Sequence, residues 1–227
     1  MLDFKSFEVL TFDCYGTLID WETGILGALR PLVAKHGKKV SDQELLALYG
    51  ELEARLEAGE YKRYREILRQ VVRAMGERLG FQATEAEMDS LPDSLGAWPP
   101  FPDTVAALRR LKSRYQLAIL SNTDDDLFAQ TAKRLEVPFD FVITAQQAGS
   151  YKPSLNNFLL ALKRVGVPQG KVLHVGQSRH HDIAPARELG LKNVLVTRRG
   201  HGATVANAAQ PDLEVPDLKT LADRAGV

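Results

Sequence analysis

Short runs of apolar and β-branched residues that alternate with helical patterns constrain the fold of this chain more than any other feature. Each run has the length of a buried strand, and each helical segment is long enough to cross over a sheet. Such alternation implies right-handed crossovers and a mainly parallel sheet. The predicted strands are 7–12, 117–120, 139–143, 171–175 and 194–196, and the predicted helices are 103–114, 125–135, 154–165 and 182–189.

The alternation stops between about residues 23 and 91, where leucines and aromatic residues recur three or four positions apart, as in helices. The segment Trp98–Pro102 closes this block, and its prolines cannot lie inside a helix. We therefore predict an α/β protein with a Rossmann-like, mainly parallel sheet core and a helical cap domain inserted after the first strand. The core comprises residues 1–19 and 98–227, and the cap domain comprises residues 20–97.

Composition excludes several classes of protein. The chain has 227 residues, 44% hydrophobic and 26% charged, which is typical of a globular protein with a buried core. Its 29 basic and 29 acidic residues cancel, so no net charge attracts nucleic acid or an anionic membrane. A single cysteine, Cys14, excludes an intramolecular disulfide and fits a reducing compartment. No signal-like start and no apolar run of about eighteen residues occurs, so we expect a cytoplasmic protein with a small-molecule substrate.

Reactive residues follow four of the predicted strands. Asp13 follows the first strand, Ser121 and Asn122 follow the second, Lys152 lies after the third, and Asp182 begins a helix after the fourth. A single aspartate at such a place is usually a turn or helix-capping residue. Because ligands bind at the carboxyl ends of parallel strands, four such positions together indicate an active site. A carboxylate there can act as a nucleophile, and a lysine can keep it ionised and oriented.

These residues lie in four segments, Asp13-Cys14-Tyr15-Gly16-Thr17-Leu18, Ser121-Asn122-Thr123, Tyr151-Lys152-Pro153 and Gly176-Gln177-Ser178-Arg179-His180-His181-Asp182. In this order they resemble the four motifs of the haloacid dehalogenase superfamily. The resemblance spans Phe7 to about Arg198, and the helical insert lies where that family carries its small cap domain. It implies that Asp13 is a nucleophile, but the superfamily contains mostly phosphatases and phosphotransferases.

Two departures from the phosphatase pattern bear on the reaction. Phosphatases of this family have a general acid two residues after the nucleophile, where this chain has Tyr15, a phenol with an ordinary pKa of about 10. They also begin the fourth motif with an acid that helps to hold Mg²⁺, where this chain has Gln177. We therefore expect no metal and no cofactor; if Mg²⁺ is bound, Asp13, Tyr15 and Asp182 are its expected ligands.

The D-x-Y-G-T form of the first motif resembles the L-2-haloacid dehalogenase branch. By that resemblance Asp13 attacks the carbon that bears the halogen, with inversion, and water opens the ester, so that an L-2-haloacid becomes a D-2-hydroxyacid. Thr17 and Lys152 position Asp13. The resemblance further implies that Ser121 holds the substrate carboxylate, Asn122 the halide, and Asp182 the hydrolytic water.

Several positions differ from that branch. Gly50 lies near the place of its cap arginine, and the insert offers Arg55, Lys62 and Arg65 as substitutes, although each also fits a solvated helix position. Arg179 replaces an asparagine, and Phe158 replaces a tyrosine. We list as candidate substrate-binding residues Tyr15, Ser121, Asn122, Phe158, Gln177 and Arg179, and as candidate pocket-lining residues Trp21, Tyr49 and Phe158.

Two other functions remain open from the sequence. One is a Mg²⁺-dependent phosphatase of a small phosphorylated metabolite with an atypical acid. The other is a binding protein that keeps the fold with weak or no turnover, although retention of Asp13, Lys152 and Asp182 argues against it. The natural substrate and a homodimeric state are likewise left open.

Overall fold

The computed structural model describes residues 2–198 and 207–227. Within these ranges six parallel strands form one sheet in the order β3-β2-β1-β4-β5-β6. The predicted α/β fold with a parallel sheet is confirmed, and the last strand was missed because it has three residues and no apolar run. The strands are β1 (Val9–Phe12), β2 (Gln116–Ser121), β3 (Phe141–Thr144), β4 (Val172–Gly176), β5 (Lys192–Val196) and β6 (Leu213–Val215).

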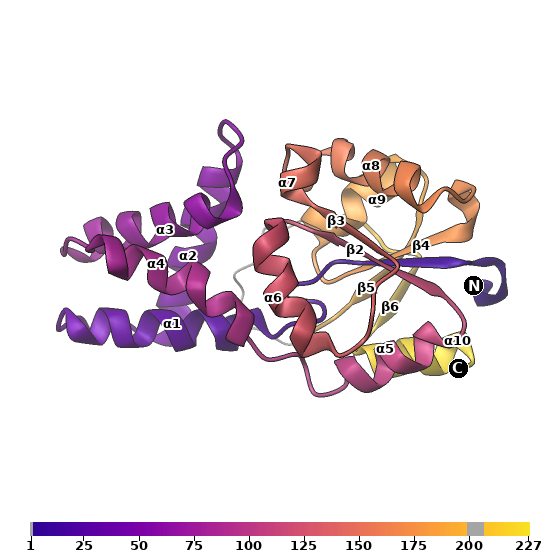
Figure 1. Cartoon of the computed structure of the whole chain (residues 1–227), viewed down its shortest axis with the longest axis horizontal. Coiled ribbons are helices and arrows are strands. Elements are labelled where there is room, and N and C mark those ends of the chain that lie inside the picture. Colours follow the sequence, from indigo (N-terminus) through magenta and orange to yellow (C-terminus); the bar gives the residue numbers. More distant parts are fainter. Residues whose placement is uncertain (1, 199–206) are drawn as a thin grey trace.

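Helices cover both faces of the sheet, as the parallel topology requires. Helices α8 and α9 pack on one face, α5 and α10 pack on the other, and α6 lies on the side that faces the inserted helices (Figure 1). The bounds of these helices are α5 (Thr104–Lys112), α6 (Asp125–Leu135), α7 (Ala145–Ala148), α8 (Leu155–Val165), α9 (Ala184–Glu188) and α10 (Leu218–Ala225).

Strand β1 is the centre of the sheet and decides where the site lies. All four of its residues are buried, and it pairs with β2 on one side and β4 on the other. The backbone N–H of Asp13 donates to the carbonyl of Val175 at 2.9 Å, so this pairing continues one residue past the strand. Asp13 therefore lies in the middle of the carboxyl edge, between the ends of β2 and β4.

Four helices, which we call the cap helices, occupy residues 21–94, a stretch that the structure describes throughout. Their starts follow local rules, since Ser41 with Glu44 and Thr84 with Glu87 form capping boxes. The cap helices are α1 (Trp21–Lys35), α2 (Asp42–Glu57), α3 (Tyr64–Leu79) and α4 (Glu85–Ser94). These helices agree with the predicted helical insert. The domain bounds of 20–97 stay a prediction. The predicted core range also includes residues 199–206, which lie outside the described residues.

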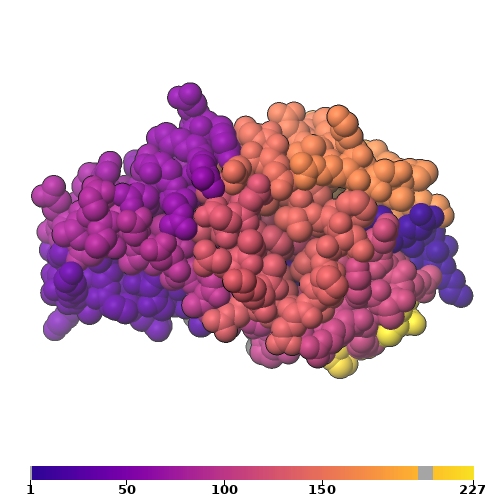
Figure 2. Space-filling view, in the orientation of Figure 1, coloured from indigo at the N-terminus to yellow at the C-terminus, as the bar shows by residue number. Residues whose placement is uncertain are grey.

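The chain leaves the sheet for the cap helices and returns from them along paired segments. The Asp20 N–H donates to the Pro99 carbonyl at 2.8 Å, and the Phe101 N–H donates to the Leu18 carbonyl at 3.0 Å. The proline-rich segment is thus one half of a two-stranded connection. In the space-filling view the cap helices adjoin the body of the molecule on one side (Figure 2).

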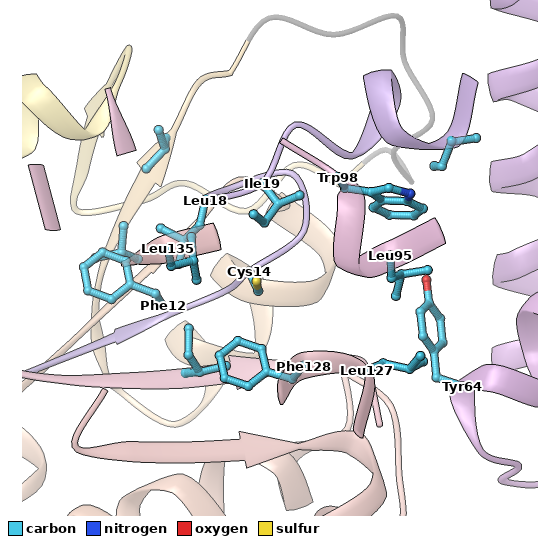
Figure 3. Close-up of a cluster of buried hydrophobic side chains, with 14 of the residues drawn as sticks. Phe12, Cys14, Leu18, Ile19, Tyr64, Leu95, Trp98, Leu127, Phe128 and Leu135 are labelled. Atoms are coloured by element: carbon cyan, nitrogen blue, oxygen red, sulfur yellow. The ribbon is translucent and has the colours of Figure 1, made fainter. Parts of the chain in front are cut away.

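A buried cluster joins the sheet to the cap helices. Figure 3 shows Tyr64 of α3 near Leu127 of α6, with Trp98 on the connection and Cys14 after β1 in the same cluster. Cys14 is fully buried, and burial raises the pKa of its thiol well above the ordinary value, which agrees with a structural role. Across the described ranges, every helix is too short or too polar to cross a membrane.

Candidate active site

One cavity between the carboxyl edge of the sheet and the cap helices brings together the reactive residues that follow four strands. Asp13, Ser121, Lys152 and Asp182 all line it, as expected for neighbouring parallel strands. The residues lining the cavity are Asp13, Tyr15, Trp21, Gly50, Glu53, Ala54, Glu57, Tyr64, Ser121, Asn122, Lys152, Gln177, Ser178, His181 and Asp182.

Both oxygens of Asp13 accept hydrogen bonds. Lys152 Nζ donates to Oδ1 at 2.8 Å, and Thr17 Oγ1 donates to Oδ2 at 2.7 Å. Thr17 Oγ1 itself accepts from the Gln177 N–H at 2.9 Å, which directs the threonine proton to Asp13. The tight turn that allows this contains Gly16, whose φ of +91° is in a region that favours glycine. The carboxylate is therefore fixed in orientation while 8% of the residue stays exposed.

Lys152 lies between two carboxylates. Its Nζ donates to Asp13 at 2.8 Å and to Asp182 at 2.6 Å, and the residue is 2% exposed. Burial disfavours the ammonium, yet the two carboxylates raise the pKa of Lys152 above its ordinary value. Burial raises the pKa of Asp13 and outweighs the opposing effect of Lys152. For Asp182 burial acts in the same direction, but Lys152 and His174 lower its pKa well below the ordinary value.

Asp182 is held by the turn that follows β4. The Ser178 N–H donates to its Oδ2 at 3.1 Å, and His174 Nε2 lies 3.3 Å from its Oδ1. The other ring nitrogen of His174 lies 2.9 Å from Thr11 Oγ1, which fits the tautomer protonated on Nε2. Gly176 leaves room for this arrangement, because a Cβ there would lie 2.4 Å from Cγ of Asp182. Asp182 lies in a single π-helical turn, Arg179–Ile183, rather than at a helix start.

Ser121 and Asn122 play different parts. Ser121 is 1% exposed, and its Oγ has no hydrogen-bond partner among the described residues although it lines the cavity. The Asn122 amide is already engaged, since its Oδ1 accepts from the Lys152 N–H at 2.7 Å and its Nδ2 donates to the Lys152 carbonyl at 3.1 Å. Asn122 thus holds the loop that carries Lys152, a role that the sequence did not predict.

Arg179 and Phe158 are not among the described residues that line the cavity, so their predicted place at the site is corrected, while substrate binding by them stays a prediction. Arg179 forms an ion pair with Glu214 of β6 and donates to the Ala209 carbonyl, so its guanidinium is already engaged. Phe158 is buried under the sheet, with its ring 5.1 Å from that of His174. It packs in the core instead of lining the pocket.

The predicted cap cations are also absent from the lining of the cavity as the described residues define it. Arg55 and Lys62 are exposed, and Arg65 forms an ion pair with Asp93 of α4. Gly50, which lies near the place of the cap arginine in the sequence comparison, does line the cavity. As a glycine it has no side chain to replace that arginine.

Two carboxyl groups of α2 reach the cavity, and the sequence analysis missed them. Glu53 Oε1 accepts from the hydroxyls of Tyr49 and Tyr64, and Glu57 Oε2 accepts from Asn122 Nδ2 at 3.3 Å. A signal existed, because Gly50, Glu53 and Glu57 are spaced by three and four residues and so share one helix face.

The aromatic residues on the cavity wall are partly as predicted. Trp21 lines the cavity, with Tyr49 edge-on behind it at 6.0 Å between ring centroids. Tyr15 also lines it, but its hydroxyl shares a hydrogen bond with Thr131 at 2.8 Å, and burial raises its pKa above the ordinary value. Its phenol is therefore an unsuitable proton donor near neutrality.

His181 also lines the cavity. Burial lowers its pKa to about 4, so the imidazole is uncharged at neutral pH.

Comparison with known proteins decides the family. The family model of the haloacid dehalogenase-like hydrolases matches residues 7–190, which is most of the chain and includes all four motifs. The chain belongs to this family.

Relatives of this haloacid dehalogenase-like hydrolase match it over nearly the full length. The (S)-2-haloacid dehalogenase H-109 of Pseudomonas putida is 28% identical over 96% of this chain and 98% of the relative. The haloacetate dehalogenase H-2 of Moraxella sp. (strain B) is 26% identical over 96% of this chain and 97% of the relative. The solved L-2-haloacid dehalogenase of Xanthobacter autotrophicus is 21% identical, with a TM-score of 0.81 over 96% of this chain and 97% of that chain.

The donor set of this hydrolase does not suit Mg²⁺. Lys152 Nζ lies within 2.8 Å of both Asp13 and Asp182, so a cation already bridges the two acids that would hold the metal. Gln177 replaces the third acid, and the Tyr15 hydroxyl points to Thr131. In the part of the chain that the structure describes, no group of three or more acidic, histidine or cysteine side chains is arranged as a metal site. A hard divalent cation prefers charged oxygen ligands, which this set supplies poorly.

Proposed function

We propose that this haloacid dehalogenase-like hydrolase is a hydrolytic dehalogenase of short 2-haloacids and uses no metal. The observation that carries the proposal is the Asp13 carboxylate, held by Lys152 and Thr17 where the second acid of a phosphatase is replaced by Tyr15. A halide leaves without a proton, and a carbon electrophile needs no divalent cation to screen phosphate charge. The relatives named as 2-haloacid and haloacetate dehalogenases support the same reaction.

In the first step an Asp13 oxygen attacks C2 of the haloacid with inversion. A carbon–oxygen bond forms, the carbon–halogen bond breaks, and the halide leaves with the electron pair. Lys152 and Thr17 orient the carboxylate, while Ser121 Oγ is the donor for the substrate carboxylate. Pre-positioning of this kind lowers the entropic part of the barrier.

In the second step water attacks Cγ of the Asp13 ester. The ester opens, the D-2-hydroxyacid leaves with the former Asp13 oxygen, and one proton is released. Asp182 supports the attacking water through the hydrogen-bonded group that it forms with Lys152 and Ser178. Gln177 contributes through its backbone, which orients Thr17.

The test is halide release from (S)-2-chloropropionate, with and without EDTA, beside p-nitrophenyl phosphate with Mg²⁺. We expect halide release that EDTA leaves intact and that Asp13→Asn abolishes, because the amide cannot form the ester. Asp223→Asn, an exposed site on α10, is the matched control and keeps full activity. In a single turnover in heavy-oxygen water, the first product oxygen comes from Asp13 and carries no label. Phosphatase activity that EDTA removes would instead establish the metal-dependent alternative.

We also propose that residues 20–97 act as a cap domain over a core of residues 1–19 and 98–227. The paired connection at Asp20 and Pro99 supports this division.

The enzyme is proposed to work in the cytoplasm on a small molecule. Light scattering coupled to size exclusion decides between monomer and homodimer.

A further inference from the structure

Four carboxyl groups and one lysine line the cavity among the described residues. Asp13 and Asp182 share Lys152 as their counter-ion, so one cation serves two acids, and α2 adds the carboxyls of Glu53 and Glu57. Of the described residues that line the cavity, Lys152 alone is a lysine or arginine. To the extent that these acids are ionised, they repel a substrate that is only an anion, and they repel a dianionic phosphate ester more.

The two cap carboxyls are arranged as hydrogen-bond acceptors. Glu57, the last residue of α2, accepts from the Asn122 amide, and Glu53 accepts from two phenols. Each of these bonds is donated to a carboxyl and stabilises its ionised form. The cap side of the cavity therefore matches a ligand group that donates hydrogen bonds and is positively charged.

A second observation on the core side points to a ligand. Ser121 Oγ is buried, lines the cavity and has no partner in the described parts of the chain. A buried hydroxyl without a partner is costly, and a ligand carboxylate would satisfy it. The core side of the cavity thus matches a negatively charged group of the ligand, and the cap side matches a positively charged one.

We propose that the substrate is a zwitterion: a 2-haloacid whose chain ends in an ammonium group, with the carboxylate at Ser121 and the ammonium at Glu57 and Glu53. The assignment of a halogen to this substrate rests on the proposed function, whereas the assignment of its two charges rests on the residues that line the cavity. Trp21 and Tyr64 also line the cavity, and aromatic rings of this kind can attract a cation.

A cationic ligand group would offset the effects that disfavour an ionised Glu57. Burial and the neighbouring Glu53 raise the pKa of Glu57 well above its ordinary value, against the effect of Lys152. A ligand cation beside the two cap carboxyls would act against this effect and favour their ionised forms. If Glu57 instead served as a protonated donor to an anion, glutamine would replace it without loss, and this is the competing outcome of the test.

The test compares two product-like ligands that differ in one group of equal size, (R)-4-amino-2-hydroxybutanoate and (R)-2-hydroxypentanoate. Calorimetry on the wild-type chain should give at least about tenfold tighter binding of the ammonium ligand. Glu57→Gln should reduce this ratio toward one, and Glu57→Asp should keep most of it. Glu60→Gln, which removes an exposed charge just beyond α2, is the matched control and keeps the wild-type ratio.

Equal binding of the two ligands to the wild type, or a ratio that Glu57→Gln does not change, would overturn the inference. Because the wild-type ratio needs no variant, the inference stays testable if Glu57→Gln does not fold. Halide release from (S)-2-chloropropionate is measured in parallel. Halide release without ammonium preference rejects the inference alone, and ammonium preference without halide release from any haloacid rejects the proposed reaction alone.

Discussion

Lys152 is the cation that the two acids of the buried centre share. Its ammonium pairs with two carboxylates that are almost completely removed from water, at 2.8 and 2.6 Å. A buried ion pair adds little to stability when compared with apolar residues, but loss of one member leaves the other charges uncompensated. The same lysine that orients the nucleophile is therefore also needed for the fold.

We predict that Lys152→Met lowers the free energy of unfolding by about 3–5 kcal/mol at neutral pH, since Asp13 and Asp182 then face each other without a cation. Urea unfolding followed by circular dichroism measures the loss. The deficit should shrink as the pH falls, because protonation removes the buried charge. Lys163→Met, at an exposed position of α8, should unfold like the wild type. A similar effect of both substitutions would contradict the role given to Lys152.

The pH dependence of activity should follow Asp13. Burial raises the pKa of this carboxyl, and only the carboxylate attacks carbon, so kcat/KM should fall with acid at a midpoint above the ordinary value of about 3.9. Steady-state rates between about pH 4 and 8 measure the midpoint. Glu57→Gln should retain the fall in activity at low pH, which would show that this fall does not come from the titration of Glu57. An acid limb that disappears in Glu57→Gln would assign the titration to the cap instead.

The turn between β4 and α9 fixes Asp182 because a glycine precedes it. A Cβ at Gly176 would lie 2.4 and 2.5 Å from Cγ and Oδ2 of Asp182, both far inside van der Waals contact. We predict that Gly176→Ala displaces the Asp182 carboxylate from Lys152 and lowers kcat by about a hundredfold, the effect expected of a misplacement near 1 Å. Gly170→Ala, where a Cβ meets nothing within 4 Å, should keep normal kinetics. Equal rates for the two variants would show that the turn tolerates a side chain.

The elements that carry Asp13, Ser121, Lys152 and Asp182 could be predicted because strand runs and loop positions are local features of the sequence. Parallel pairing then brings their carboxyl ends together without further information. Glu57 and Arg179 could not be placed in this way, because each depends on how one element packs against another. Arg179 follows a predicted strand as Asp182 does, yet it turns to Glu214 on a strand of three residues that has no sequence signal.

The cap helices and the core are joined by more than the paired connection. Asp124, in the loop after β2, accepts from the N–H groups of Tyr64 and Arg65 at 3.0 and 2.9 Å, and Arg63 Nε lies 3.6 Å from it. Its side chain thus caps the start of α3 instead of its own helix α6. A core carboxylate that satisfies free N–H groups of a cap helix fixes the relative position of the two parts.

This contact leads to a prediction about how the cap helices and the core act together. Asp124→Ala removes the cap of α3 and should lower the free energy of unfolding by about 1 kcal/mol, because two helix N–H groups lose their acceptor. The larger effect should be on KM, which rises several-fold while kcat changes little, since Tyr64 begins α3 and lines the cavity that holds substrate. Hydrogen exchange should speed up at the first turn of α3 and not at α8. Asp126→Ala, which removes a half-exposed carboxylate paired with Arg63, is the control, and it should leave KM near the wild-type value. A matching rise of KM in both variants would show that surface charge, and not the helix cap, links the cap to the core.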